Sequence, residues 1–402
     1  MPSVGRFVFL AALAGIGWAA PPGPSHVSRH ASARPTRAMA VVCAVAGTNC
    51  GSVANLPARG TLGAYALDTT VDDEVARYYL ERYLQGRADN PELDQRIGRL
   101  HTTLSTGVPS RDQLKGISKE FSVDFAALVF ANQLLKQDGN PGLQEDFLAS
   151  FDKVKTGSIQ YRHKDTLVMF VPGYDYVENG HATGADFARP RKILKDAGYD
   201  VHFVDIDPIG TVEENAEYLA NAVRKNRGRS MVIAGASSAG PAIHLALGKV
   251  LKPSDVENVK AWLNLGGILQ GVPILDKFAS GPKGLFFSSI VMFKGWRHSS
   301  FESMYTPVSR QRFSTLSVPR HIAIYNYVGL SLSGNISAFG WDKYLMMRED
   351  GPNDGLTLLP DIIAPNSLSI LSPTTDHFFA EDPDIDNKTM ALVATLLERL
   401  DR

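Results

Sequence analysis

The chain has 402 residues, of which 44% are hydrophobic and 21% are charged, and its formal net charge at pH 7 is −1. This length has room for one large domain, or for one domain with an accessory one, and the composition is that of an ordinary globular protein. The balanced charge argues against nucleic acid or an anionic surface as a partner.

The first 20 residues are typical of a secretory signal peptide. A single Arg6 precedes an apolar run that extends from Phe7 to about Ala20 and ends at a proline-rich break. The run is short for a membrane span, so an uncleaved anchor is only the alternative. We therefore expect export to the periplasm or to the extracellular space.

Residues 21–67 are predicted to be a leader or linker. They are rich in Arg, Ser and Ala, and the first acidic residue of the chain is Asp68. Acid-free stretches of this kind also occur in transit peptides, so organelle targeting through a bipartite leader is the alternative localisation. Both cysteines of the chain, Cys43 and Cys50, lie in this stretch. They are close enough for a small-loop disulfide after export, and they lack the companions of a metal site.

Residues 68–156 are predicted to be a helical accessory region. Apolar side chains recur at three- and four-residue spacing in several segments, with Ser110 and Ser122 as candidate N-caps and "DGNPG" as a stop signal. The segment contains no catalytic constellation. We expect these helices to pack on the main domain; a surface for an unidentified protein partner is the alternative.

Residues 157–402 alternate apolar strands with amphipathic helices. The expected strands are 166–171, 199–207, 230–235, 259–267, 320–328 and 367–372. This alternation predicts an α/β fold, in which helices cover both faces of a mostly parallel sheet. No antiparallel strand pair is expected before residue 160. Ligands of such sheets bind at the carboxyl ends of the strands, so the loops after these strands should hold the chemistry.

The stretch "GASSAG" at 235–240 lies between a strand and a helix and contains two candidate nucleophiles. A sharp strand–serine–helix turn needs small residues two positions before and after the serine. Ser237 has Gly235 and Ala239 there, whereas Ser238 has Ala236 and Gly240. We favour Ser237, because it leaves Ala239 and Gly240 to pack the start of the helix against the sheet.

A serine nucleophile needs a base and an orienting acid, which follow it in the order acid, then histidine. His377 is the one histidine after residue 328, and it lies directly after the last expected strand. For the acid we favour Asp354, because the Asn-Asp-Gly turn around it holds a carboxylate rigidly. Asp350 and Asp342 are the alternatives.

Two backbone N–H groups are expected to form an oxyanion hole. One belongs to Ser238, the residue after the nucleophile, and the other to Tyr174, in the loop "VPGYDY" after the first central strand.

Residues 160–402 resemble the α/β-hydrolase superfamily, in particular its bacterial lipases and esterases. The resemblance lies in "VPGYDY", "GASSAG", "NDGLT" and "DHF", in this order, and in "LGGILQGVPILDKF" at 265–278. The sequence differs from this family at two points. It has Pro-Gly in place of the usual His-Gly of the oxyanion loop, and Ala-Ser in place of the usual His-Ser of the elbow. The resemblance implies the α/β-hydrolase fold and hydrolysis of acyl esters, and the differences leave the substrate open.

The segment 277–304 is rich in Phe, Met, Trp and Ile. We expect it to be a lid over the mouth of the site that contacts acyl chains or a lipid surface; a buried crossover between strands is the alternative. The sequence shows no metal-ligand cluster and no P-loop or dinucleotide motif, so we expect neither metal nor cofactor.

Together these features predict a secreted serine hydrolase that cleaves carboxylic esters, with lipid or other acyl esters as the substrate class. Ser237, His377 and Asp354 would form the triad, and the reaction would pass through an acyl-enzyme. A thioesterase or amidase with the same triad is one alternative. A catalytically silent α/β-hydrolase scaffold used for binding is the other.

Overall fold

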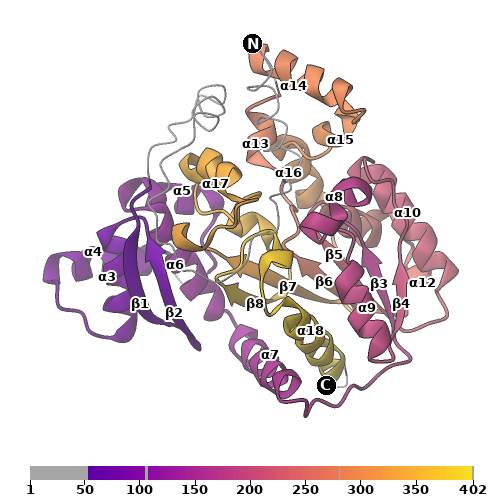
Figure 1. Cartoon of the computed structure of the whole chain (residues 1–402), viewed down its shortest axis with the longest axis horizontal. Coiled ribbons are helices and arrows are strands. Elements are labelled where there is room, and N and C mark those ends of the chain that lie inside the picture. Colours follow the sequence, from indigo (N-terminus) through magenta and orange to yellow (C-terminus); the bar gives the residue numbers. More distant parts are fainter. Residues whose placement is uncertain (1–52, 105–106, 280, 401–402) are drawn as a thin grey trace, which may run out of the picture.

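The computed structural model describes residues 53–104, 107–279 and 281–400, and Figure 1 shows the arrangement of its elements. Its centre is a six-stranded sheet with the order β4-β3-β5-β6-β7-β8, in which all neighbouring strands are parallel. The strands are β3 (Leu167–Val171), β4 (Asp200–Phe203), β5 (Met231–Ala236), β6 (Val259–Leu265), β7 (Ala323–Leu330) and β8 (Leu368–Pro373). The predicted α/β class is confirmed.

Each predicted strand has a counterpart, but β4 is shorter than the expected 199–207. It pairs only with β3, from Leu167↔Asp200 to Phe170↔Phe203, because it is the edge strand of the sheet. Beyond it, Val204 still donates to the carbonyl of Phe170 (2.9 Å), and the chain then turns away. The apolar residues 204 and 206 are buried outside the sheet, which explains why the apolar run overestimated the strand.

The strand order reverses direction at β3. The chain leaves β3 to form β4 on one side and then crosses back through α10 (Val212–Lys225) to form β5 on the other side. The loops that follow β3 and β5 therefore diverge at the carboxyl edge of the sheet. Such a switch point leaves a crevice in which α/β proteins bind their ligands.

Alternate side chains of the central strands face opposite layers. Met169, Val171 and Ile233 pack with α10 and with α11 (Ala239–Leu245) in one core. Val168, Phe170, Val232 and Ala234 face the other core, which contains α7 (Asn140–Lys155), α9 (Ala188–Asp196) and α18 (Ile385–Arg399). Both faces are thus buried, which explains the continuous apolar runs in the sequence.

Shorter elements complete the part of the chain after α7. They are α8 (Tyr176–Thr183), the π-helical turn η2 (Ala246–Val250), α12 (Pro253–Val256), α13 (Pro273–Asp276), α14 (Gly281–Phe293), α15 (His298–Glu302), α16 (Thr306–Thr315), α17 (Trp341–Met347), and the 3-10 turns η3 (Ser333–Asn335), η4 (Arg348–Asp350), η5 (Leu359–Ile362) and η6 (Phe379–Glu381). In the described ranges, every helix is too short or too polar to cross a bilayer.

An antiparallel hairpin precedes the helices, so the expectation of no strand pair before residue 160 is wrong. It consists of β1 (Leu56–Leu62) and β2 (Tyr65–Val71), and its first strand lies in the stretch expected to be leader or linker. Only one face of the hairpin is buried, through alternate residues such as Ala58, Leu62 and Leu67. Pro57 and Gly60 interrupt the strand signal further, which explains why the pattern did not reveal it.

Residues 1–52 lie outside the described residues, and with them the predicted signal peptide, most of the leader, and both cysteines.

The helical region expected over 68–156 is present. Its helices are α3 (Glu74–Glu81), η1 (Tyr83–Gln85), α4 (Pro91–Leu104), α5 (Arg111–Glu120), α6 (Val123–Leu135) and α7. Ser110 and Ser122 cap α5 and α6, as predicted. The hairpin and α3–α6 share a hydrophobic core with residues of β7, β8 and η5, so this region packs on the main sheet.

The N-terminal region also covers the free edge of β8. The backbone N–H groups of Ser369 and Leu371 donate to the side-chain oxygens of Asn140 and Gln144 on α7, each at 2.8 Å. The carbonyl of Leu371 accepts a hydrogen bond from the Tyr65 hydroxyl (2.9 Å). An edge strand with unpaired polar groups invites aggregation, and these side chains satisfy the edge as a neighbouring strand would.

A buried pair of carboxylates joins the two regions. Asp124 accepts hydrogen bonds from the backbone N–H of Asp72 (2.8 Å) and Ser333 (2.9 Å) and from the Ser333 hydroxyl (2.5 Å). Arg348 pairs with Asp72 at 2.8 Å. Burial, and then the charge of Asp72, raise the pKa of Asp124 from its ordinary 3.8 to about 7.

The Asp124 carboxyl should make stability depend on pH. Its raised pKa means that the folded protein keeps a proton there up to about pH 7, whereas the unfolded chain releases it near pH 4. The contribution of Asp124 to the free energy of unfolding is therefore fully present below about pH 4 and is lost as the pH rises through about 7. Urea unfolding of the wild type and of Asp124→Asn, which does not titrate, should show that the wild type loses stability relative to the variant between pH 5 and pH 8.

The control is Asp68→Asn, because the Asp68 side chain is 69% exposed. The difference in free energy of unfolding between Asp68→Asn and the wild type should stay constant over the same pH range. A wild-type advantage over Asp124→Asn that is constant or rises with pH would contradict the prediction.

Candidate active site

The turn between β5 and α11 holds Ser237 in a strained backbone conformation. Ser237 has φ = 55°, in the left-handed region, whereas Ser238 has φ = −63° and belongs to the helical turn. The turn is fixed by backbone hydrogen bonds to the carbonyl of Ser237 from Gly240 (3.0 Å) and Ile268 (3.1 Å). A left-handed conformation at a non-glycine residue is costly, and such strain concentrates at functional sites.

Close packing explains the small residues around this turn. A Cβ added to Gly235 would lie 2.3 Å from Cδ1 of Ile243 and 3.1 Å from Cβ of Ala239. A Cβ added to Gly240 would lie 2.7 Å from Cα of Gly267, in the loop after β6. Side chains of α11 therefore crowd position 235, and the backbone of the loop after β6 crowds position 240. This geometry fits the serine elbow with Ser237 at its apex.

His377 lies in the loop after β8 and contacts Asp354. The distance between Nδ1 of His377 and Oδ2 of Asp354 is 2.8 Å, and the backbone N–H of His377 also donates to the carbonyl of Asp354 (2.8 Å). Both side chains are buried. With Nδ1–H donating to the carboxylate, Nε2 keeps its lone pair and is free to accept a proton.

The Asn-Asp-Gly turn positions the carboxylate of Asp354. Its Oδ1 accepts from the backbone N–H groups of Leu356 (2.9 Å) and Thr357 (2.8 Å), which leaves Oδ2 for His377. The alternative acids lie elsewhere. Asp350 pairs with Lys115 and Lys277, and Asp342 lies in the first turn of α17, where burial raises its pKa.

The loop after β3 lies beside Ser237. A Cβ added to Gly173 would lie 3.6 Å from Cβ of Ser237, so the backbone of this loop comes close to the serine. Tyr174 follows Gly173, and both line the same cavity as Ser237. The Tyr174 ring packs on Trp296 and Phe301, in the core that contains α10 and α11. Tyr174 therefore brings its backbone, rather than its phenol, to the site.

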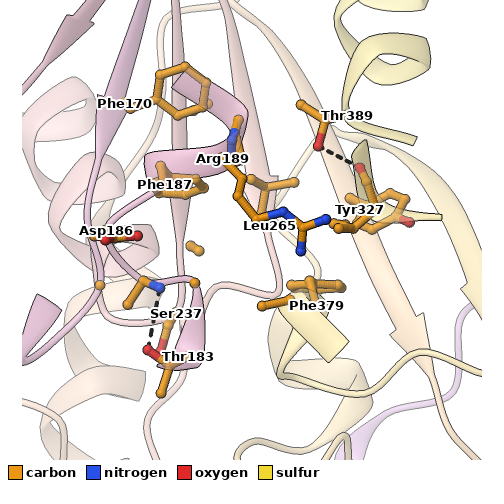
Figure 2. Close-up of a pocket in the computed structure, with 18 of the residues that line it drawn as sticks. Phe170, Thr183, Asp186, Phe187, Arg189, Ser237, Leu265, Tyr327, Phe379 and Thr389 are labelled. Carbon is orange, nitrogen blue, oxygen red and sulfur yellow. Dashed lines mark hydrogen bonds between the residues drawn. The ribbon is translucent and has the colours of Figure 1, made fainter. Parts of the chain in front are cut away.

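Ser237 and His377 line one cavity of about 480 Å³, whose walls Figure 2 shows. This volume is within the range of small-molecule sites. Among the described residues, no hydrogen bond joins the Ser237 hydroxyl to His377. Such contacts are often long before substrate binds. The arrangement provides a hydroxyl, an imidazole with an oriented tautomer, and a buried carboxylate at one switch-point crevice.

The described residues contain no cluster of three or more His, Cys, Asp or Glu side chains that could hold a metal ion.

The described residues of 277–304, most of which lie in α14 and α15, do not line this cavity, so they do not form the predicted lid over it in this structure. Its connection to the site is indirect, through the packing of Trp296 and Phe301 on Tyr174. Figure 1 shows α14 projecting from the top of the molecule.

Sequence reasoning missed Lys343, which lines the cavity although it is only 4% exposed. Its Nζ donates to the carbonyl of Phe339 (2.6 Å), and burial lowers its pKa to about 8. In the sequence it is a lysine in a short helix, which usually indicates an exposed position, so no local signal was available.

The chain has the α/β-hydrolase fold, an assignment that rests on its strand order and on the strand–Ser237–helix turn. No protein-family model matches the chain, and none of the curated proteins compared matches it. Among solved structures it is similar to a metagenomic carboxyl esterase, with 15% identity and a TM-score of 0.49 over 60% of this chain and 77% of that chain. It is also similar to a mature lipase of Bacillus licheniformis, with 22% identity and a TM-score of 0.43 over 55% and 87%. A thioesterase from the prodiginine pathway of Streptomyces coelicolor has 14% identity and a TM-score of 0.33 over 58% and 91%.

Proposed function

We propose that the protein is a serine hydrolase that cleaves carboxylic esters with an apolar acyl group. One observation carries the proposal: a serine with left-handed φ and a histidine paired at 2.8 Å to a buried aspartate line the same cavity. Acyl transfer to serine requires a serine in a strained turn, a base that is oriented toward it, and a buried acid that holds the base.

In the proposed reaction, Oγ of Ser237 attacks the ester carbonyl carbon while Nε2 of His377 takes the hydroxyl proton. The carbonyl electron pair moves to oxygen and forms a tetrahedral oxyanion. When this intermediate collapses, the bond to the alcohol oxygen breaks, and His377 returns the proton to the departing alcohol. Water then attacks the acyl-enzyme by the same route and releases the acid.

Asp354 would act by holding His377 in the tautomer whose Nε2 is basic and by stabilising the imidazolium that forms. Its other oxygen is occupied by two backbone N–H groups, so the carboxylate stays fixed while the proton moves. The oxyanion would be held by the N–H groups of Ser238 and Tyr174. The left-handed turn at Ser237 and the approach of Gly173 support this assignment, because they bring both backbones next to the serine.

The acyl acceptor is water in this proposal, and the leaving group is an alcohol. A thiol or amine leaving group would use the same machinery, so a thioesterase or amidase is the alternative within the class. The alternative outside the class is a silent scaffold that binds a ligand without turnover. The intact Ser237, His377 and Asp354 argue against it, because binding alone does not require them.

Active-site labelling tests the nucleophile. A fluorophosphonate probe should label the wild type and Ser238→Ala, and Ser237→Ala should lose the label, because only the elbow serine is activated. Peptide mapping of the wild type should place the label on the peptide that contains residue 237. The measurement is in-gel fluorescence followed by mass spectrometry.

Loss of label only in Ser238→Ala would instead place the nucleophile one residue later. A folded wild type that is never labelled, with or without detergent, would favour the silent scaffold.

Ester kinetics test the acid. Asp354→Asn should lower kcat for a soluble short-chain ester by about 10³- to 10⁴-fold, because the amide favours the wrong histidine tautomer. Asp350→Asn is the matched control and should keep kcat within about twofold, because Asp350 is engaged by two lysines instead. Circular dichroism should show that both variants fold. Equal losses in the two variants would contradict the assignment of Asp354.

We also propose that α14 contacts a lipid surface. Leu285, Met292 and Phe293 are 75%, 79% and 82% exposed, and their spacing places them on one side of the helix. Clustered exposed apolar side chains are typical of lipid or protein contact sites. The contact of Trp296 with Tyr174 would connect such docking to the loop after β3.

This contact predicts vesicle binding. The wild type should co-sediment with phosphatidylcholine vesicles, and Met292→Glu/Phe293→Glu should bind at least tenfold more weakly, since burying each apolar side chain contributes about 1.5–3 kcal/mol. Tyr218→Glu is the control, because Tyr218 is an exposed large side chain that belongs to α10 rather than to α14. Unchanged binding of the double variant would refute the role of α14.

A further inference from the structure

Lys343 brings a buried positive charge to the cavity that contains Ser237. It lies in α17, is 4% exposed, and lines the cavity together with Ser237 and His377. A lysine ammonium has three N–H donors. Among the described residues, one of them donates to the carbonyl of Phe339 (2.6 Å), and no ion pair joins Lys343 to a carboxylate. Two of its donors therefore have no protein acceptor in this part of the chain.

The carboxylates that act on Lys343 do so without pairing with it. The charges of Asp342 and Asp376 raise the pKa of Lys343, but burial outweighs them and lowers it to about 8. Asp376 is engaged elsewhere, because its Oδ2 accepts from the backbone N–H of Ser337 and its Oδ1 from that of Phe378, each at 2.8 Å. Lys343 is thus still mostly protonated at pH 7, and burying its charge costs free energy.

The start of α17 contacts both loops that carry the proposed acid and base. A Cβ added to Gly355, the last residue of the Asn-Asp-Gly turn, would lie 3.0 Å from Cα of Gly340, the N-cap of α17. A Cβ added to Gly340 would lie 2.7 Å from Oδ2 of Asp376, which directly precedes the histidine. Lys343 follows Gly340 by three residues, so it lies on the same side of the helix. The position of Lys343 is therefore fixed relative to the triad loops.

The ring of Phe378 connects Lys343 to the proposed base. Nζ of Lys343 lies 5.2 Å from the centre of this ring, and the centre of the His377 ring lies 5.7 Å from it. Phe378 also lines the cavity. In the proposed reaction His377 returns its proton to the departing alcohol, so the alcohol part of the ester leaves beside this histidine. This geometry places Lys343 on the side of the cavity that the alcohol part would occupy.

The other charged groups of the cavity favour an anion at Lys343 over one elsewhere. Asp175 and Asp186, in the segment after β3, line the cavity and disfavour an anion on their side. Arg189 also lines it, but this side chain is 56% exposed and pairs with Asp386 at 3.0 Å. One buried ammonium matches the single charge of a carboxylate, whereas a phosphate monoester carries about −1.5 to −2 at pH 7.

We propose that Lys343 binds a carboxylate on the alcohol part of the substrate and thereby selects O-acylated hydroxy acids. The ammonium would donate to a carboxylate oxygen while the ester carbonyl lies at Ser237. This ion pair would offset the cost of burying the lysine charge. The inference rests on the proposed serine hydrolase function and adds a substrate class to it. Lys343 is a specificity residue in this scheme, because it contacts the substrate and takes no part in proton transfer.

The test compares two butyryl esters that differ in one substituent. The first is p-butyryloxybenzoate, whose leaving alcohol carries a carboxylate, and the second is p-tolyl butyrate, which carries a methyl group at the same ring position. At pH 7, Lys343→Met should lower kcat/KM for the first ester by about tenfold or more relative to the second, because hydrogen bonds between charged groups are the strong ones. The loss should fall mainly on KM, since the contact is made in both the ground state and the transition state.

The matched control is Lys277→Met. Lys277 is also a largely buried lysine that donates to a carbonyl of α17, that of Met346, but it pairs with two carboxylates and does not line the cavity. This variant should keep the wild-type ratio of kcat/KM between the two esters. If Lys343→Met does not fold, Lys343→Gln, which keeps a donor for the Phe339 carbonyl without the charge, decides the question.

Two results would overturn the inference. One is a folded Lys343→Met whose ratio of kcat/KM between the two esters equals that of the wild type. The other is a loss confined to mono-p-nitrophenyl glutarate, whose carboxylate is on the acyl part, since Lys343 would then serve the acyl side.

Binding without turnover separates this inference from the catalytic proposal. Ser237→Ala should bind p-butyryloxybenzoate in isothermal titration calorimetry, and adding Lys343→Met should weaken the binding by about tenfold or more. If fluorophosphonate labelling of the wild type fails while this binding is present and depends on Lys343, the catalytic proposal is wrong and the carboxylate site stands. If labelling succeeds and the binding does not depend on Lys343, the carboxylate site is wrong.

Discussion

The left-handed turn at Ser237 is the constraint on which the site depends. A residue with φ = 55° reverses the chain from β5 into α11 within two residues, and this conformation persists only because neighbouring backbones hold it. Those backbones come from β6 and the loop after it: the carbonyl of Leu265, at the end of β6, accepts from the N–H of Ser237, and the N–H of Ile268 donates to the carbonyl of Ser237. Close packing by α11 at position 235 and by the loop after β6 at position 240 favours glycine there, so the surroundings of the turn also constrain the local sequence.

The sheet topology places the other groups around this turn. Because β4 lies on the far side of β3, the loop after β3 is left beside the loop after β5, and Gly173 approaches Ser237. The loop after β8 reaches back toward the same edge with His377, and the Asp354 turn meets it there. The N-terminal region contributes to this arrangement from outside, since its side chains satisfy the free edge of β8, the strand that carries the His377 loop.

Much of the fold could be predicted from the sequence, because strands buried on both faces appear as uninterrupted apolar runs whichever neighbours they have. The β1–β2 hairpin was missed, since it is buried on one face only and contains Pro57 and Gly60. The end of β4 was overestimated for a related reason: apolar residues after Phe203 are buried outside the sheet, and hydrophobicity does not distinguish these two kinds of burial.

The sequence by itself determined the kinds of groups at the site and their order along the chain, because a sharp strand–helix turn and an Asn-Asp-Gly turn are local properties. Only the tertiary structure shows that the left-handed conformation falls on Ser237 rather than on Ser238, and that Asp354 contacts His377 at 2.8 Å. The cavity likewise belongs to the tertiary structure. Its walls come from strands and a helix that lie more than a hundred residues apart, and alternate apolar residues look the same in a sequence whether they line a cavity or fill a core.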